Sequence, residues 1–409
     1  MKKLSKSRLQ VIVLYLCTLL GLLLGVVVSV INTRSLDPEL YGSFRYVQNI
    51  ISFISSILLF GFFTSGSRLL AISNNEDHSS SIRGAMMVIL SSTIVILMLC
   101  MGVLYLININ MAPQMANLYL ISIPVCGNIL MLNYINTTAQ GDNHIFRIAF
   151  ARILPSVVYI LLAFLCYRLY DVTPELMLIL YNGSAVLVLG SIILSTKPSF
   201  VGLKAAFCCL IQENKSYGFN VYMGSLMGVS TQYLVGITLG LFCNDNANVG
   251  FYTLALTISS PLAMLPTIVG TTYFKRFATE SQISPQIMYS TIFITMLSCL
   301  IYCLLIKYVV AFLYDSSYSS VSRYAQCLAI GMCFHGFGDM INRFLGAHGK
   351  GAYLRNAAIS CGFVAIIGSF LGVYAFQIQG AIVTKILSSL SYMLVLLYYY
   401  RRFTKDQTL

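Results

Sequence analysis

The chain has 409 residues, of which 58% are hydrophobic and only 9% are charged, and its formal net charge is +12. A water-soluble domain carries roughly 25% charged residues, so this composition excludes an ordinary soluble globular fold. Most of the surface must face lipid instead. Helices are the expected elements, because an α-helix satisfies its own backbone hydrogen bonds inside hydrocarbon.

Apolar runs of transmembrane length recur along the whole chain. About 20 residues of helix cross the ~30 Å hydrocarbon core of a bilayer. The runs predict an all-α polytopic membrane protein with twelve transmembrane helices. In chain order, the predicted helices cover residues 9–31, 46–67, 85–106, 116–138, 148–170, 175–195, 217–242, 250–272, 288–312, 323–345, 353–375 and 380–400.

The distribution of basic residues predicts the orientation. The start, MKKLSKSR, is like the basic region of a signal peptide, but the apolar run behind it is too long and has no small-x-small cleavage site. It is therefore expected to be an uncleaved first helix. With the N-terminus inside, most lysines and arginines fall on inner loops and tails, which predicts cytoplasmic termini. This bias accounts for the net charge without a nucleic-acid partner.

The chain divides into two similar halves. We expect an N-terminal six-helix lobe at 1–195, a cytoplasmic amphipathic linker at 196–216, and a C-terminal six-helix lobe at 217–409. Residues recur at an offset of 208, as listed by the pairs Asp37/Asp245, Gly42/Gly250, Gly141/Gly349 and Arg147/Arg355. Because each half crosses the membrane six times, both halves begin on the same side. The two repeats are therefore parallel. Transporters built this way hold their substrate in a central cavity between the halves.

Charged residues inside or beside the predicted helices are candidates for a substrate site. A charge at the bilayer centre costs ~2.5–3.5 kcal/mol, so it usually faces a cavity or a partner. The candidate substrate-binding cations are Arg34, Arg45, Arg152, Lys307 and Lys385. If these cations lie in one cleft, their summed electrostatic field would attract an anion. The planar guanidinium group of arginine, with its several hydrogen-bond donors, suits phosphate.

Simpler interpretations of these charges stay open. In NTRSLDPELYGSFRYV (32–47), Arg34 can pair with Asp37 and Glu39 with Arg45, which would only tie the turn together. Each lysine can also extend its long side chain to the headgroups.

The acidic residues allow ion coupling but no other cofactor. Asp37 and Asp339 are the candidate carboxylates for coupling to H⁺ or Na⁺. Arg343 lies four residues after Asp339 on the same helix face, so the two can simply neutralise each other. The twelve cysteines contain no C-x-x-C pair, and we expect neither disulfides nor a metal site.

The stretch R34-S-L-D-P-E-L-Y-G42 resembles the R-x-L-x-P-x-x-[FY]-G segment that follows the first helix of polysaccharide and O-antigen flippases. These belong to the multidrug/oligosaccharidyl-lipid/polysaccharide exporter (MOP) superfamily. The resemblance implies a carrier of undecaprenyl-diphosphate-linked oligosaccharide, an O-antigen or capsule repeat unit, across the bacterial inner membrane. It implies Arg34 as a cavity cation, with Pro38 and Gly42 shaping the turn. Other polysaccharide-assembly proteins are possible partners.

Two other classes remain as alternatives. A cation-coupled multidrug exporter of the same superfamily would share the fold, but it should favour acidic cavity residues, whereas the charges within the predicted helices are mostly basic. An enzyme acting on lipid-linked sugars usually carries a large outer loop. Here the outer loops are short, and the sequence contains no D-x-D, H-E-x-x-H or G-x-S-x-G motif.

Overall fold

The structure is a computed structural model that describes residues 6–73, 75–243 and 245–408. The basic residues Lys2 and Lys3 lie outside this range. The described residues form helices joined by short turns, with no β-strand among them, which confirms the predicted all-α membrane fold. Eight of the described helices are long and apolar enough to cross a bilayer, or up to nine if one bent pair counts as a single span. The number twelve stays a prediction.

The helices group into two compact units. Unit 1 comprises the chain up to Leu36 together with Val47–Leu226, and unit 2 comprises Asp37–Tyr46 together with Met227–Leu409. The linker predicted at 196–216 therefore lies within unit 1, whereas the charged segment that follows the first helix groups with unit 2. Each unit is described by itself below.

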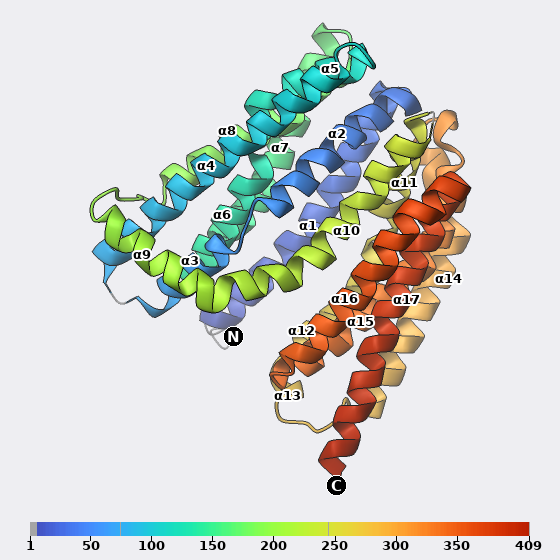
Figure 1. The fold of residues 1–409 in the computed structure, drawn as a ribbon. Coiled ribbons are helices and arrows are strands. Elements are labelled where there is room, and N and C mark those ends of the chain that lie inside the picture. Colours follow the sequence, from blue (N-terminus) through green and yellow to red (C-terminus); the bar gives the residue numbers. More distant parts are fainter. Residues whose placement is uncertain (1–5, 74, 244, 409) are drawn as a thin grey trace. The chain divides into compact units, whose positions relative to one another are not determined.

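Unit 1 is a bundle in which α1 packs on α7, α7 on α8, α3 on α6, and α4 on α5 (Figure 1). Its helices are α1 (Lys6–Ser35), the later turns of α2 (Pro38–Ile57), α3 (Phe62–Ile72), α4 (Glu76–Asn108), α5 (Pro113–Ser122), α6 (Asn128–Gly141), α7 (Ile145–Leu169), α8 (Pro174–Leu194), α9 (Leu203–Glu213) and the start of α10 (Phe219–Phe242).

The helix predicted at 46–67 is broken in the structure, where α2 and α3 meet at an angle of 57°. The break lies at Phe60 and Gly61, which adopt φ values of 45° and 81°. Asn214 stabilises it, because its side-chain amide donates to the Phe60 carbonyl over 3.1 Å. A Cβ on Gly61 would lie 2.5 Å from the Gly218 carbonyl oxygen, so only glycine fits here.

Unit 2 is built around α15 (Val321–Ala347), which packs against α11 (Ala247–Ser259), α12 (Pro261–Thr272), α14 (Pro285–Leu313), α16 (Gly351–Ile367) and α17 (Val373–Thr408). The four-residue α13 (Phe274–Phe277) precedes α14. Aromatic packing dominates one end of the unit, where Phe344 is fully buried against Phe277 and Phe403. Gln377 has a φ of 49° and turns the chain inside α17, between the helices predicted at 353–375 and 380–400.

The first turns of α2 cross α11 through two glycines, and all of these residues belong to unit 2. A Cβ on Gly42 would lie 1.8 Å from the carbonyl oxygen of Asn246, and one on Gly250 would lie 3.2 Å from that of Pro38. The two contacts are equivalent, because 42 and 250 differ by 208 residues, as do 38 and 246. This is the geometry expected of two related helices that cross near a local two-fold axis.

Candidate substrate-binding site

Unit 1 contains a cavity of about 340 Å³ among α1, α6, α7 and α8, whose mostly apolar wall carries a few polar groups and one cation. Arg152 of α7 lines it and is exposed, and its guanidinium donates to the Thr18 hydroxyl over 3.3 Å. The wall also carries hydroxyl and amide groups, from Thr18, Asn128, Ser156 and Tyr181. One accessible cation beside neutral donors and acceptors suits an anionic ligand with hydroxyl groups.

Buried amides continue from this cavity into the core of unit 1. The Asn182 carbonyl oxygen accepts from Asn128 over 2.9 Å and from Gln48 over 3.0 Å. The Asn182 amide nitrogen is buried without a partner among the described residues. Burying an unpaired polar group costs about 1–3 kcal/mol, so such an atom marks a place where water or a ligand group is expected to bind.

The charged turn after α1 is mainly a packing element in the structure. Pro38 opens α2, Gly42 makes the crossing described above, and Arg45 donates from Nε to the Tyr41 hydroxyl over 2.8 Å. The Arg45 guanidinium also lies 5.3 Å from the centre of the Tyr41 ring, a cation–π contact. Arg34 lies in the last turn of α1, Asp37 follows two residues after its end, and both are exposed. Their assignment to substrate binding and ion coupling stays a prediction.

The two predicted lysines occupy different surroundings within unit 2. Lys307 is exposed on α14, beside the strongly exposed Leu304 and Tyr308. Lys385 of α17 is half-buried, and its electrostatic neighbours are Asp339 and Cys361. The surroundings of Lys385 suit a counter-ion for a carboxylate at least as well as a ligand for a substrate anion.

Asp339 lies at the centre of a polar cluster among α12, α15 and α17. Its carboxylate accepts from the Tyr392 hydroxyl and from the Thr267 hydroxyl, each over 3.2 Å. The ring of His335 stacks on Tyr392 at 5.2 Å, and its Nδ1 is buried without a partner among the described residues. The cluster therefore combines a carboxylate, an imidazole and an ammonium group inside unit 2, and Arg343, the partner predicted for Asp339, is exposed.

Unit 2 also contains an apolar cavity of about 580 Å³ along α14, α15 and α17. Its lining carries no charged residue, and its α14 side runs from Met288 to Cys303. At 1.5 Å per residue that distance is about 22 Å, most of the hydrocarbon thickness of a bilayer. On the same helix, Phe293, Met296 and Leu300 are more than half exposed, as expected for a helix that faces lipid.

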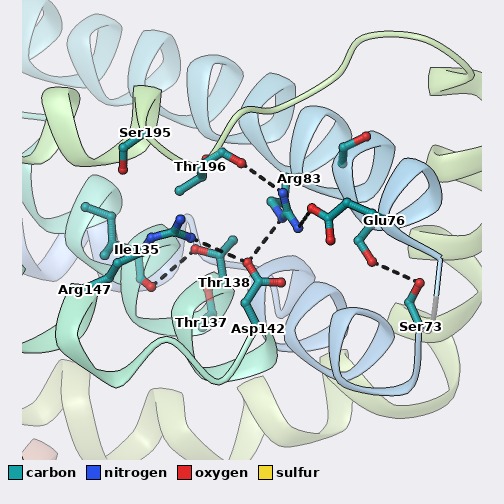
Figure 2. Close-up of polar contacts among 12 residues, drawn as sticks. Ser73, Glu76, Arg83, Ile135, Thr137, Thr138, Asp142, Arg147, Ser195 and Thr196 are labelled. Atoms are coloured by element: carbon teal, nitrogen blue, oxygen red, sulfur yellow. Dashed lines mark hydrogen bonds and ion pairs between the residues drawn. The ribbon is translucent and has the colours of Figure 1, made fainter.

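The sequence did not single out the most connected ion-pair cluster, which lies at one end of unit 1 (Figure 2). Arg83 is almost fully buried and contacts Glu76 at 2.7 Å, Asp142 at 3.2 Å and the Thr196 carbonyl at 2.9 Å. Arg147 adds a second cation 3.8 Å from Asp142. Arg83 and Asp142 are 59 residues apart in sequence, and only the packing of α4 on α6 brings them together.

These features define a class: a multi-pass helical membrane protein with two helical units, one of which holds a cavity lined by a cation and the other a cavity without charged residues. The chain belongs to the family described as "Polysaccharide biosynthesis protein", whose model matches residues 8–278. No curated protein matches the sequence.

Solved structures show the same fold at low sequence identity. The lipid II flippase MurJ in an inward closed conformation has a TM-score of 0.73 and 15% identity, covering 95% of this chain and 87% of its own. An inward-facing MATE-family multidrug resistance transporter of the MOP superfamily has a TM-score of 0.66 and 13% identity, covering 94% and 95%. A MOP-superfamily transporter from Pyrococcus furiosus has a TM-score of 0.59 and 13% identity, covering 98% and 96%. The fold is thus that of MOP-superfamily transporters.

Proposed function

We propose that this protein is a flippase that moves an undecaprenyl-diphosphate-linked oligosaccharide across the bacterial inner membrane by alternating access. The observation that carries the proposal is the cavity of unit 1, where the accessible Arg152 stands among amide and hydroxyl groups on an otherwise apolar wall. Membership of a polysaccharide biosynthesis family supports a glycan as cargo. The resemblance of fold to a lipid II flippase supports a lipid-linked form of it.

The physical demands of this cargo agree with the two kinds of cavity. A diphosphate and sugars cannot cross hydrocarbon unaided, because burying unpaired charges and hydroxyls costs many kcal/mol. We assign the headgroup to the cavity of unit 1, with Arg152 as a phosphate ligand, and we keep Arg34, which does not line this cavity, as a second candidate cation. Considered by itself, the apolar cavity of unit 2 has no charged lining residue and suits hydrocarbon such as a polyprenyl chain. Translocation then breaks no covalent bond, and we propose no enzymatic step.

We also propose that Asp339 couples transport to an ion, H⁺ or Na⁺. Its carboxylate lies inside unit 2 and is held in place by two hydroxyl donors. It can therefore bind and release an ion while the surrounding packing is kept. Both termini are expected to face the cytoplasm.

The test is a flipping assay in proteoliposomes with a diphosphate-linked glycolipid. We expect Arg152→Ala and Arg34→Ala to slow flipping. Arg152→Lys and Arg34→Lys should retain part of the flipping rate. Arg323→Ala is the matched control, because Arg323 is exposed on unit 2 and is not among the candidate ligands. Normal flipping by the double alanine variant at matched protein levels would contradict the proposal. Transport of a cationic dye instead of the glycolipid would favour the multidrug exporter.

A further inference from the structure

A basic and apolar strip runs along the outer side of α9 and the segment before it. On α9 the exposed Lys204, Cys208 and Ile211 recur every three or four positions, which places them on one helix face, whereas the residues before Leu203 lie in a non-helical segment. The strip consists of Lys197, Val201, Lys204, Cys208, Ile211 and Lys215, all exposed. The opposite face, Ala206, Leu210 and Asn214, is buried against α3 and α4.

The strip is held rigidly on unit 1 at its first end. The Ser199 amide donates to the Ser80 carbonyl over 2.9 Å, and the Ser81 hydroxyl donates to the Val201 carbonyl over 2.8 Å. Gly84 permits this approach, because a Cβ there would lie 1.9 Å from the Ser199 carbonyl oxygen. The basic segment therefore has a fixed position at the beginning of α4.

The second end of the strip is fastened as firmly. Glu213, the only acidic residue between 196 and 217, turns away from the strip and pairs with Arg68 at 2.6 Å. The Ser65 hydroxyl donates to the side-chain oxygen of Asn214 over 3.1 Å. The strip therefore presents lysines without a neighbouring carboxylate from its own segment.

We propose that this strip docks on the anionic headgroups of the adjacent lipid leaflet. Lysines alternate with exposed apolar residues, the most exposed being Val201 at 79%, and this pattern is that of helices lying in the interface between headgroups and acyl chains. Each lysine near an anionic surface adds to the attraction between the strip and that surface. The ion-pair cluster of Arg83, Glu76 and Asp142 is adjacent to the strip (Figure 2). The strip therefore lies at the polar end of unit 1. Anionic lipid thereby holds the connection to α10 against the membrane.

A single tryptophan tests the proposal, because the natural chain contains none. Val201→Trp places the fluorophore on the strip, and the protein is reconstituted in vesicles of phosphatidylcholine and phosphatidylglycerol, with bromine on the chains of one lipid at a time. We expect quenching by brominated phosphatidylglycerol to exceed quenching by brominated phosphatidylcholine about twofold or more. High salt should reduce the difference through screening.

Two further variants isolate the role of charge. Lys197→Glu, Lys204→Glu and Lys215→Glu together should abolish the lipid preference, whereas the same three positions changed to arginine should keep it. Leu106→Trp is the control reporter, because it is exposed at the far end of α4 in a segment without charges, and it should be quenched equally by both lipids in every variant. Equal quenching of Val201→Trp by both lipids, or a preference that survives the triple glutamate variant, would overturn the proposal.

Discussion

Gly42 of α2 lies directly on the backbone of Asn246, so close that a methyl group on Gly42 would overlap the Asn246 carbonyl oxygen at 1.8 Å. The related Gly250 faces Pro38 and Tyr41 at 3.0 Å or more. The glycine that ends the charged motif thus serves a helix crossing. This explains why a small residue is needed there whatever the neighbouring charges do.

We expect Gly42→Ala to destabilise the protein by about 1–3 kcal/mol or more, because backbone cannot yield as a side chain can. Gly250→Ala should cost less, since its neighbours are farther away. Gly102→Ala is the matched control, because no atom lies within 4 Å of the added Cβ and alanine favours helix. Thermal unfolding in detergent measures all three. A melting temperature of Gly42→Ala equal to that of the natural protein would refute the crossing.

Arg83→Leu should destabilise unit 1 by about 3–5 kcal/mol, because it leaves the buried Asp142 without its nearest cation. Arg147, at 3.8 Å, compensates only in part. Arg276→Ala serves as control: it removes an exposed pair with Glu280 at 2.6 Å, which contributes about 0–1 kcal/mol. Limited proteolysis between α3 and α4 and thermal unfolding report the loss. Similar behaviour of the two variants would show that the Arg83 cluster is not structural.

Arg152→Ala should weaken the binding of a diphosphate-linked headgroup by about tenfold or more, as expected for a lost charged hydrogen bond. Arg152→Lys should retain part of the affinity, because it keeps the charge but not the planar fork. The matched control is Arg323→Ala, whose side chain is exposed on unit 2 and is not among the candidate ligands. Binding is measured by titration with a water-soluble short-chain diphosphate glycan. An unchanged affinity of Arg152→Ala would remove this cavity from consideration.

Filling the apolar cavity should affect long lipid chains only. Cys299→Phe adds a ring to its lining, and we expect slower flipping of the full-length polyprenyl substrate but not of a short-chain analogue. Leu304→Phe is the control, because Leu304 is 64% exposed on the same helix and does not line the cavity. Equal effects of Cys299→Phe on the long and short substrates would contradict the assignment of the polyprenyl chain.

Asp339→Asn removes a charge while keeping the shape of the side chain. If Asp339 couples transport to an ion, flipping by this variant should no longer respond to an imposed H⁺ or Na⁺ gradient, although binding of the headgroup is retained. The assay compares initial flipping rates with and without each gradient. A variant that responds to the gradient as the natural protein does would exclude Asp339 from coupling.

The sequence predicted the long helices well, because their apolar runs decide where backbone can lie in lipid. It predicted the break between α2 and α3 poorly. The helix 46–67 looks continuous in its composition, and the break depends on Asn214, more than 150 residues later, which caps the Phe60 carbonyl. Such a distant partner leaves no mark in the local pattern.

The candidate charges show the same limit. Composition located Lys385 within a helix, but it did not reveal that Asp339 and His335 are its electrostatic neighbours. Arg83 precedes the predicted helix 85–106 as a single basic residue, and its role depends on Asp142 and Thr196, which follow other helices. A sequence locates a charge along a helix, but tertiary packing decides its partner.

The grouping of Asp37–Tyr46 with unit 2 has a consequence for biosynthesis. During translation this segment leaves the ribosome long before α11 and Tyr318, on which it packs. At ~5–20 residues per second, the roughly 200 residues up to Asn246 take about 10–40 s to be made. For that time Gly42 lacks the Asn246 backbone and Tyr41 lacks the Tyr318 ring, so the nascent chain must hold its second helix without these native contacts. Completion of the second half then draws it into place.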